Sequence, residues 1–176
     1  MHEVLEGHEG HVEGPLAMPV TVTLSILAVL LALVTLFVHR AAKEELLLQN
    51  QESDQWAFFQ AKNSGLHGMQ TGADMLTVLA PADKEKAATL REKYLKEADR
   101  YNAEKTEAKD KADELKNERL IVERRGDRYE GGEVLLEIAL IVCSFTLLTK
   151  KKIFWHSGMV VGLLGIGVAL SGFLLR

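Results

Sequence analysis

The residues of this 176-residue sequence that could do chemistry include one acidic side chain in an apolar run. Glu137 lies within Val134–Thr149, and an ionisable side chain inside a membrane is a candidate for an ion or proton path. Glu137 follows Glu133 by about one helical turn, so it could instead lie at a membrane surface and reach water. Because the apolar runs hold no second acidic residue that could form a relay, we favour the interfacial position.

Three histidines near the N-terminus, His2, His8 and His11, alternate with glutamates. Imidazole and carboxylate groups suit zinc or nickel, and a short His-rich tract is a compositional sign of metal binding. Residues 1–18 show no periodicity that would preorganise ligands, so we expect a disordered acidic tail that binds metal weakly at most. The tract HEGH lacks the HExxH spacing of zinc proteases, and we predict no catalytic residue, no enzyme activity and no cofactor.

Three apolar runs predict membrane helices at 19–39, 132–149 and 157–175. At about 1.5 Å per residue, the uncharged stretches Thr21–Val38 and Ser157–Leu175 approach the roughly 30 Å of a bilayer core. The residues before the first run include no Lys or Arg, unlike a signal peptide, so we expect a retained anchor. We interpret Cys143 as a packing residue and 150–156 as a basic, aromatic loop at the membrane surface.

Between the first two predicted spans, the sequence is rich in the helix formers Ala, Glu, Lys, Leu and Gln. We predict an all-α fold in which an antiparallel helical hairpin, similar to a coiled coil, joins the first two of three membrane helices. Its outgoing arm covers 40–80 and its returning arm 81–131, with Pro81 in the first turn of the second arm. Gly65, Gly68 and Gly72 each cost about 1 kcal/mol relative to Ala in a helix, so we expect a break near 65–72.

Small and aromatic residues recur every seven positions along the returning arm, which is half of a coiled-coil pattern. They are Ala87, Tyr94, Tyr101, Ala108, Leu115, Val122 and Tyr129. A solvated helix with incidental alanines is the alternative interpretation. Trp56 and Phe59 share a helix face, and we expect them to pack against this column near Leu115, Val122 or Tyr129. Phe58 points elsewhere and predicts a second contact surface, most simply with another copy of the chain.

Two membrane runs carry small residues at spacings of four and three, which would let helices approach closely. The third run has Gly158, Gly162, Gly165, Ala169 and Gly172, and the first has Thr21, Ser25, Ala28 and Ala32. The pattern predicts close helix packing and leaves open whether the two ridges meet within one chain or between chains.

The segment SDQWAFFQAK at 53–62, and the ending in which TKKKIFWHSG precedes a Gly-rich apolar run, carry a family resemblance. The layout resembles bacterial membrane proteins grouped as domain of unknown function 4337, over nearly the full length. Those proteins commonly have tyrosines where this chain has Phe58 and Phe59. The resemblance implies a bacterial, membrane-bound protein and implies no enzyme activity.

Charges flanking the runs give conflicting signals for orientation. Arg40 and Lys43 after the first run, and the arginines at 124–128 before the second, favour a cytoplasmic hairpin. Lys150–Lys152 in a short loop argue the reverse, and we expect the cytoplasmic arrangement in a bacterial inner membrane.

The function that we predict is a scaffold or accessory subunit that self-associates and presents the hairpin. The expected partners are the bilayer and a second copy, and they could include another membrane protein complex. The sequence has no stripe of basic residues, so we predict that nucleic acid is not a partner. The alternative is a small ion or proton channel or transporter that uses Glu137.

Overall fold

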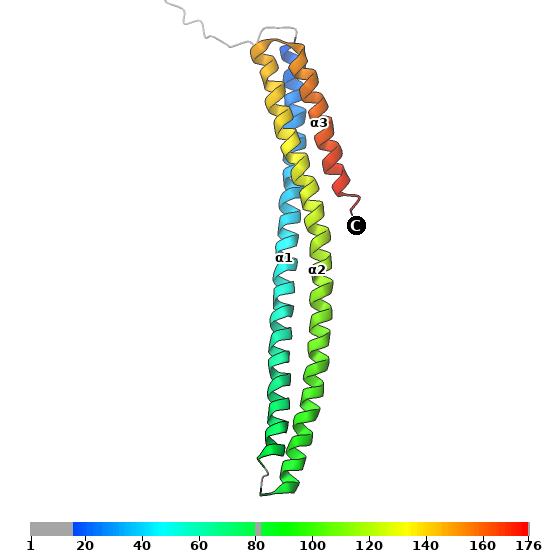
Figure 1. Ribbon diagram of the computed structural model, residues 1–176. Coiled ribbons are helices and arrows are strands. Elements are labelled where there is room, and N and C mark those ends of the chain that lie inside the picture. The colour runs from blue at the N-terminus through cyan, green and yellow to red at the C-terminus, as the bar shows by residue number, and fades with distance from the viewer. Residues whose placement is uncertain (1–15, 80–81, 176) are drawn as a thin grey trace, which may run out of the picture. The chain divides into compact units, whose positions relative to one another are not determined.

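The computed structural model describes residues 16–79 and 82–175, and over these residues it is all-helical (Figure 1). The helices are α1 (Ala17–Val78), α2 (Lys84–Thr149) and α3 (Lys152–Gly172). Each of the three is long and apolar enough to cross a membrane. The predicted all-α class with three membrane-competent helices is confirmed, and the chain is compatible with a membrane protein. The histidines at 2, 8 and 11 lie outside the described residues, whereas Ala17 and Met18, assigned to the tail, already belong to α1.

The predicted break near 65–72 is wrong, because α1 continues through Gly65, Gly68 and Gly72 to Val78. Two of these glycines face tyrosine rings of α2 at distances that leave no room for a larger side chain. Tertiary packing of this kind outweighs the intrinsic cost of glycine in a helix, which is about 1 kcal/mol per residue. The glycines therefore allow close contact between helices. The sequence alone is compatible both with such a contact and with a break.

The start of α2 is set by an N-cap, since the Asp83 carboxylate accepts a hydrogen bond from the Lys86 backbone N–H at 3.1 Å. This bond, with the Lys86 side chain at 3.1 Å, lowers the pKa of Asp83. Pro81, expected in this first turn, lies outside the described residues.

The predicted loop at 150–156 is largely helical, because α3 already begins at Lys152. Lys150 has a φ of 55°, in the left-handed region that often ends a helix, and its N–H donates to the Thr146 carbonyl at 2.8 Å. Lys151 is extended and serves as the N-cap position of α3. A reversal made by two residues places Phe154 and Trp155 in the first turn of α3 rather than in a loop.

The chain forms two compact units, and α1 and α2 contribute to both. Among the described residues, unit 1 comprises 16–41 and 124–175. Its core contains Leu27, Leu136, Ala139 and Cys143, with partly buried residues such as Leu24 and Val161 packed around them. This core joins residues of α1, α2 and α3, so all three apolar runs contribute to one packed cluster.

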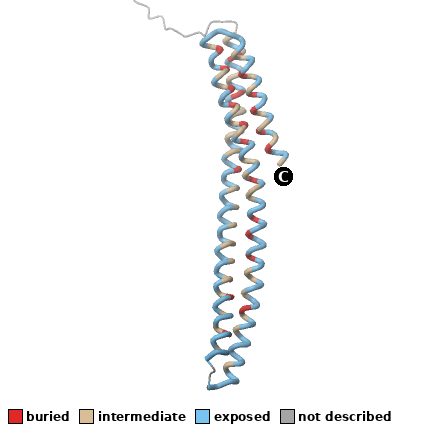
Figure 2. The backbone as a smooth tube through the Cα atoms, viewed as in Figure 1, coloured by how far each residue is buried: buried red, intermediate tan, exposed pale blue. Residues whose placement is uncertain are grey.

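Unit 2 comprises Ala42–Glu123 and has a narrow, alanine-rich interior. Its buried apolar residues are Leu66, Ala73, Ala98, Ala108, Ala112, Leu115 and Val122. Small side chains at an interface let two helix backbones approach closely. Figure 2 shows these buried positions as isolated points along helices that are otherwise mostly exposed. Each helix of unit 2 therefore buries one stripe and leaves the rest of its circumference open.

Candidate functional site

The helix segments of unit 2 contact each other where glycines of α1 receive tyrosine rings of α2. A Cβ atom added to Gly65 would lie 2.9 Å from Cε1 of Tyr101, and one added to Gly72 would lie 3.0 Å from Cε2 of Tyr94. Nothing within 4 Å faces the corresponding position at Gly68. Tyr94 and Tyr101 were singled out by the seven-residue recurrence, and the structure brings both to this contact.

The remaining members of the seven-residue column also lie on the inner face of α2. Ala108, Leu115 and Val122 are buried, and Ala87 is half-buried. The seven-residue recurrence thus marks the side of α2 that faces α1, but it does not identify the glycines of α1 as the partners. The available signal was the seven-residue spacing of Gly65 and Gly72, which matches that of Tyr94 and Tyr101.

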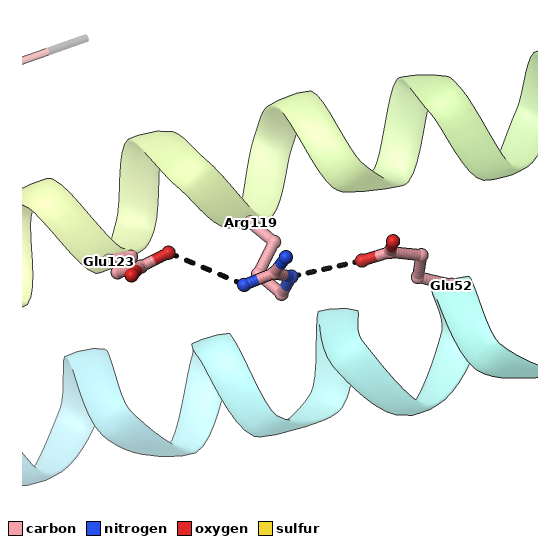
Figure 3. Close-up of polar contacts among 3 residues, drawn as sticks. All are labelled: Glu52, Arg119 and Glu123. Carbon is pink, nitrogen blue, oxygen red and sulfur yellow. Dashed lines mark hydrogen bonds and ion pairs between the residues drawn. The ribbon is translucent and has the colours of Figure 1, made fainter.

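Charged residues of α2 that flank the seven-residue column pair with α1. The Arg119 guanidinium donates to Glu52 at 2.9 Å and to Glu123 at 3.3 Å (Figure 3). The hydrogen bond to Glu52 raises the pKa of Arg119. Farther along, Lys62 forms an ion pair with Glu104 at 2.5 Å, and this bond lowers the pKa of the Glu104 carboxyl. These polar positions therefore contribute contacts, although exposed pairs of this kind stabilise by only about 0–1 kcal/mol each.

Trp56 and Phe59 contact each other edge to face, with ring centroids 5.5 Å apart. Both rings are half-buried, in accordance with a shared helix face. Of the three alternative neighbours expected for these rings, Tyr129 instead belongs to unit 1, where it is buried against Phe37 and Phe173. The seven-residue recurrence continues to Tyr129 because the same face of α2 stays buried, but there it packs on different partners.

A shallow groove in unit 2 runs beside Phe58. Gln55 and Phe58 of α1 contribute to it, and the remaining lining residues come from α2: Ala103, Glu104, Thr106, Glu107, Ala108, Asp110, Lys111 and Glu114. Phe58 is 46 % exposed, and the Lys62 ammonium lies 4.7 Å above its ring in a cation–π contact. The groove is thus lined by both apolar and charged side chains, and Phe58 lies outside the buried stripe.

In unit 1, the small-residue ridge of α3 packs against α2. All five of its members, Gly158, Gly162, Gly165, Ala169 and Gly172, are buried. A Cβ at Gly165 would lie 3.0 Å from the Gly132 carbonyl oxygen and from Leu135 Cβ, so the two backbones are in close contact. One of the two predicted ridges is therefore a helix-packing surface within the chain.

The ridge of α1 does not meet that of α3 within the chain. Thr21, Ser25, Ala28 and Ala32 are exposed on unit 1, whereas Val20 and Leu27 form the buried face of α1. The hydroxyls of Thr21 and Ser25 donate to carbonyls four residues earlier in the same helix, so they serve no helix-to-helix bond here. Within the chain, the glycine face of α3 contacts α2 at Gly158 and Gly165 and Leu27 of α1 at Gly162, so it does not meet the small residues of α1.

Acidic residues of α2 near the start of its apolar run differ in their surroundings. Glu137 is exposed on unit 1, whereas the Glu133 carboxylate is part-buried and accepts a hydrogen bond from the Thr35 hydroxyl at 2.5 Å. Trp155 similarly donates from Nε1 to the Thr23 hydroxyl at 3.1 Å. Neither bond could be predicted from the sequence, because no sequence pattern connects residues so far apart in the chain.

Metal ions in proteins are held by sets of His, Cys, Asp or Glu side chains that lie close together. Within residues 16–79 and 82–175, no group of three His, Cys, Asp or Glu side chains lies close enough to hold a metal ion. Cys143 is fully buried in unit 1, where its sulfur faces the backbone of Gly158.

Comparisons with known proteins agree with the family resemblance of the sequence. A search of curated proteins gave no match, and a search of solved structures gave none. The family model described as Domain of unknown function (DUF4337) matches residues 16–175, which include all three helices. The chain therefore belongs to the DUF4337 family.

Proposed function

We propose that this protein is an integral membrane scaffold or accessory subunit that self-associates and presents residues 42–123 for protein–protein interaction. In this proposal the three apolar runs span the bilayer, and unit 2 is an antiparallel helical hairpin of the coiled-coil type outside it. The pairing partners support an antiparallel arrangement: Glu52 contacts Arg119, Gly65 faces Tyr101, and Thr77 bonds Arg91. Residue numbers fall along α2 as they rise along α1.

The observation that carries the proposal is an apolar face that unit 2 leaves open. Phe58 is 46 % exposed and Leu47 is 63 % exposed, and these residues are separated by eleven positions, or about three helical turns. They therefore share a face of α1. On α2, Ile121 is 38 % exposed and lies eleven positions after the groove residue Asp110. These two residues therefore share a face of α2. Large apolar side chains gathered on one side of a charged, water-exposed element are typical of an interaction surface.

A second copy of the chain is the occupant that we infer for this face. Glu107 and Lys111 both line the groove, one turn apart on α2 and opposite in charge. A two-fold axis between them would place the Glu107 of each copy opposite the Lys111 of the other, as an isologous interface requires. Phe58, at the same groove, would supply the apolar centre.

The particle mass in detergent tests self-association through this face. The charge introduced by Phe58→Glu should reduce the mass of the purified full-length protein, measured by light scattering, from an oligomer toward a single chain. Val78→Glu is the matched control, because Val78 is 81 % exposed and lies about 200° around α1 from Phe58. An unchanged mass in Phe58→Glu, or a single-chain mass for the wild type, would contradict the proposal.

We also infer that the protein resides in a bacterial inner membrane with unit 2 in the cytoplasm. The arginines of the sequence between the first two spans support this orientation. A cysteine at Ser64, in a Cys143→Ser background, should resist an impermeant maleimide in intact cells and react after permeabilisation. Labelling in intact cells would show that unit 2 lies on the outer side of the membrane and would contradict the inferred orientation.

A channel or transporter based on Glu137 receives no support from its position. The side chain is exposed on unit 1 rather than directed into the core that the three helices form.

A further inference from the structure

Aromatic rings from three different segments of unit 1 gather at one level. Phe37 of α1 lies 5.7 Å from Tyr129 of α2 and 5.1 Å from Phe173, which directly follows α3. The Tyr129 and Phe173 rings are 5.4 Å apart. This trio lies at the end of the first and third apolar runs and just before the start of the second. The ends of all three apolar runs therefore meet at this level, where the hydrocarbon core of a bilayer that holds the runs would end.

Four arginines of unit 1 lie within about a turn and a half of this aromatic trio. They are Arg40 on α1 and Arg124, Arg125 and Arg128 on α2. The two helices are level here, because a Cβ at Gly126 would lie 3.6 Å from the Cβ of Ala41. Arg125 also connects to the end of the third run, since its Nη2 donates to the Leu175 carbonyl at 3.3 Å. We call these four residues the arginine collar.

The charge of the collar is only partly balanced within unit 1. On α2, Asp127 lies among the arginines and Glu130 follows them, and the next acidic residue, Glu133, accepts the bond from Thr35. Among the described residues, no ion pair involves Arg40, Arg124 or Arg128. All three of these side chains are exposed. The collar thus presents guanidinium groups to whatever surrounds unit 1 at the aromatic level.

We propose that the arginine collar binds the phosphate groups of anionic lipids, with the Phe37–Tyr129–Phe173 trio marking the membrane surface. A guanidinium donates paired hydrogen bonds that match phosphate oxygens, and basic side chains beside a span attract anionic headgroups. Anchoring of Arg125 to Leu175 holds one member of the collar at the end of the third run. This inference rests on insertion of the apolar runs into a bilayer and does not require self-association.

The opposite end of the α2–α3 pair provides the comparison that makes the proposal specific. Lys150, Lys151 and Lys152 are also basic, and Phe154 and Trp155 follow them. An ammonium group is a strongly hydrated point charge without the planar fork of arginine. A purely electrostatic attraction would act on both ends, whereas recognition by guanidinium groups favours the collar.

Native mass spectrometry of the full-length protein in neutral maltoside micelles tests the proposal. The probes are dioleoyl phosphatidylglycerol and dioleoyl phosphatidylcholine, and the readout is the number of lipids retained as each is titrated. Arg40→Gln/Arg124→Gln/Arg128→Gln removes the exposed arginines and leaves Arg125 in place. Lys93→Gln/Lys96→Gln/Lys116→Gln in unit 2 removes the same charge elsewhere, and Lys150→Gln/Lys151→Gln/Lys152→Gln removes it at the other end. Circular dichroism confirms that each variant keeps its helix content.

We expect the wild type to retain phosphatidylglycerol in preference to phosphatidylcholine, and the arginine variant to bind phosphatidylglycerol on the order of a hundredfold more weakly. Both lysine variants should bind within about threefold of the wild type. Equal retention of the two lipids would overturn the proposal, as would a loss in either lysine variant that matches the loss in the arginine variant. Displacement of the lipid by millimolar inorganic phosphate would also overturn it, by showing a site for free phosphate. The oligomer mass in the same spectra reports self-association separately.

Discussion

At the scale of single residues, glycine has opposite roles at neighbouring positions of α1. Gly65 and Gly72 leave room for the rings of Tyr101 and Tyr94, whereas Gly68 faces open space. The absent side chain is thus needed at the first two positions and only weakens the helix at the third. Unit 2 depends on these close approaches because its interior is built mainly of alanine.

Leucine substitutions at Gly65 and Gly68 should therefore shift stability in opposite directions. Gly65→Leu places a side chain where Tyr101 already lies, and overpacking of this kind destabilises by about 1–3 kcal/mol. Gly68→Leu should stabilise by about 1 kcal/mol through helix propensity alone. Thermal unfolding of the full-length protein in detergent, followed by circular dichroism, measures both. Equal midpoints for the two variants would mean that the tyrosine contact at Gly65 contributes nothing.

The Lys62–Glu104 pair should make the stability of unit 2 dependent on pH. The bond to Lys62 lowers the pKa of Glu104 below its ordinary value of 4.5, so the folded state favours the ionised carboxylate. The contribution to stability is then fully present above the unfolded pKa and is lost as the pH falls through the lowered folded pKa. Glu104→Gln should unfold more easily than the wild type near neutral pH and should match it under strongly acidic conditions. A constant difference across this range would exclude the linkage.

At the scale of helices, α3 is held by backbone contact along its glycine ridge. Gly165 lies against Gly132, Leu135 and Leu136 of α2, whereas nothing within 4 Å faces Gly167, two residues later in the same helix. The same residue type thus distinguishes the packed side of α3 from its open side. A substitution at Gly167 can therefore serve as the control for the same substitution at Gly165.

Gly165→Leu should separate α3 from α2 and expose Cys143, while Gly167→Leu should have little effect. Cys143 is fully buried in unit 1 and is the only cysteine of the sequence, so its rate of modification by N-ethylmaleimide reports the integrity of the contact. We expect a lower unfolding midpoint and at least a tenfold faster modification in Gly165→Leu. The idea fails if Gly167→Leu reacts as fast or if neither variant differs from the wild type.

The helices could be predicted from the sequence because their signals are periodic and local. Apolar runs of membrane length, the seven-residue column of α2 and the small-residue ridge of α3 each appear within one segment. The continuous helix through Gly65 and Gly72 could not be predicted. Glycine has a low helix propensity, and the contacts with the tyrosines become apparent only when the position of α2 is known. The Thr35–Glu133 bond and the exposure of the α1 ridge likewise depend on which helices meet, a property of the whole arrangement.

At the scale of the whole molecule, the chain combines a unit of three membrane-competent segments with a unit of paired helices. Each unit has its own core, and they differ in chemistry. Unit 1 is held by glycine ridges, buried aliphatic residues and a few polar bonds. Unit 2 is held by small residues, tyrosine rings and ion pairs, and it exposes the face around Phe58. We propose that the first unit inserts into the membrane and that the second unit associates with a second copy.

Hydrogen–deuterium exchange of the reconstituted full-length protein tests this account most directly, by comparing the wild type with Phe58→Glu. We expect the amides of residues 42–123 to exchange far more slowly than those of an unfolded chain, because both helices of unit 2 are paired. In Phe58→Glu, protection should fall around residues 55–58 and 103–114 and stay unchanged within the apolar runs. Exchange of 42–123 at the rate of an unfolded chain, or identical protection at 103–114 in both proteins, would contradict the account.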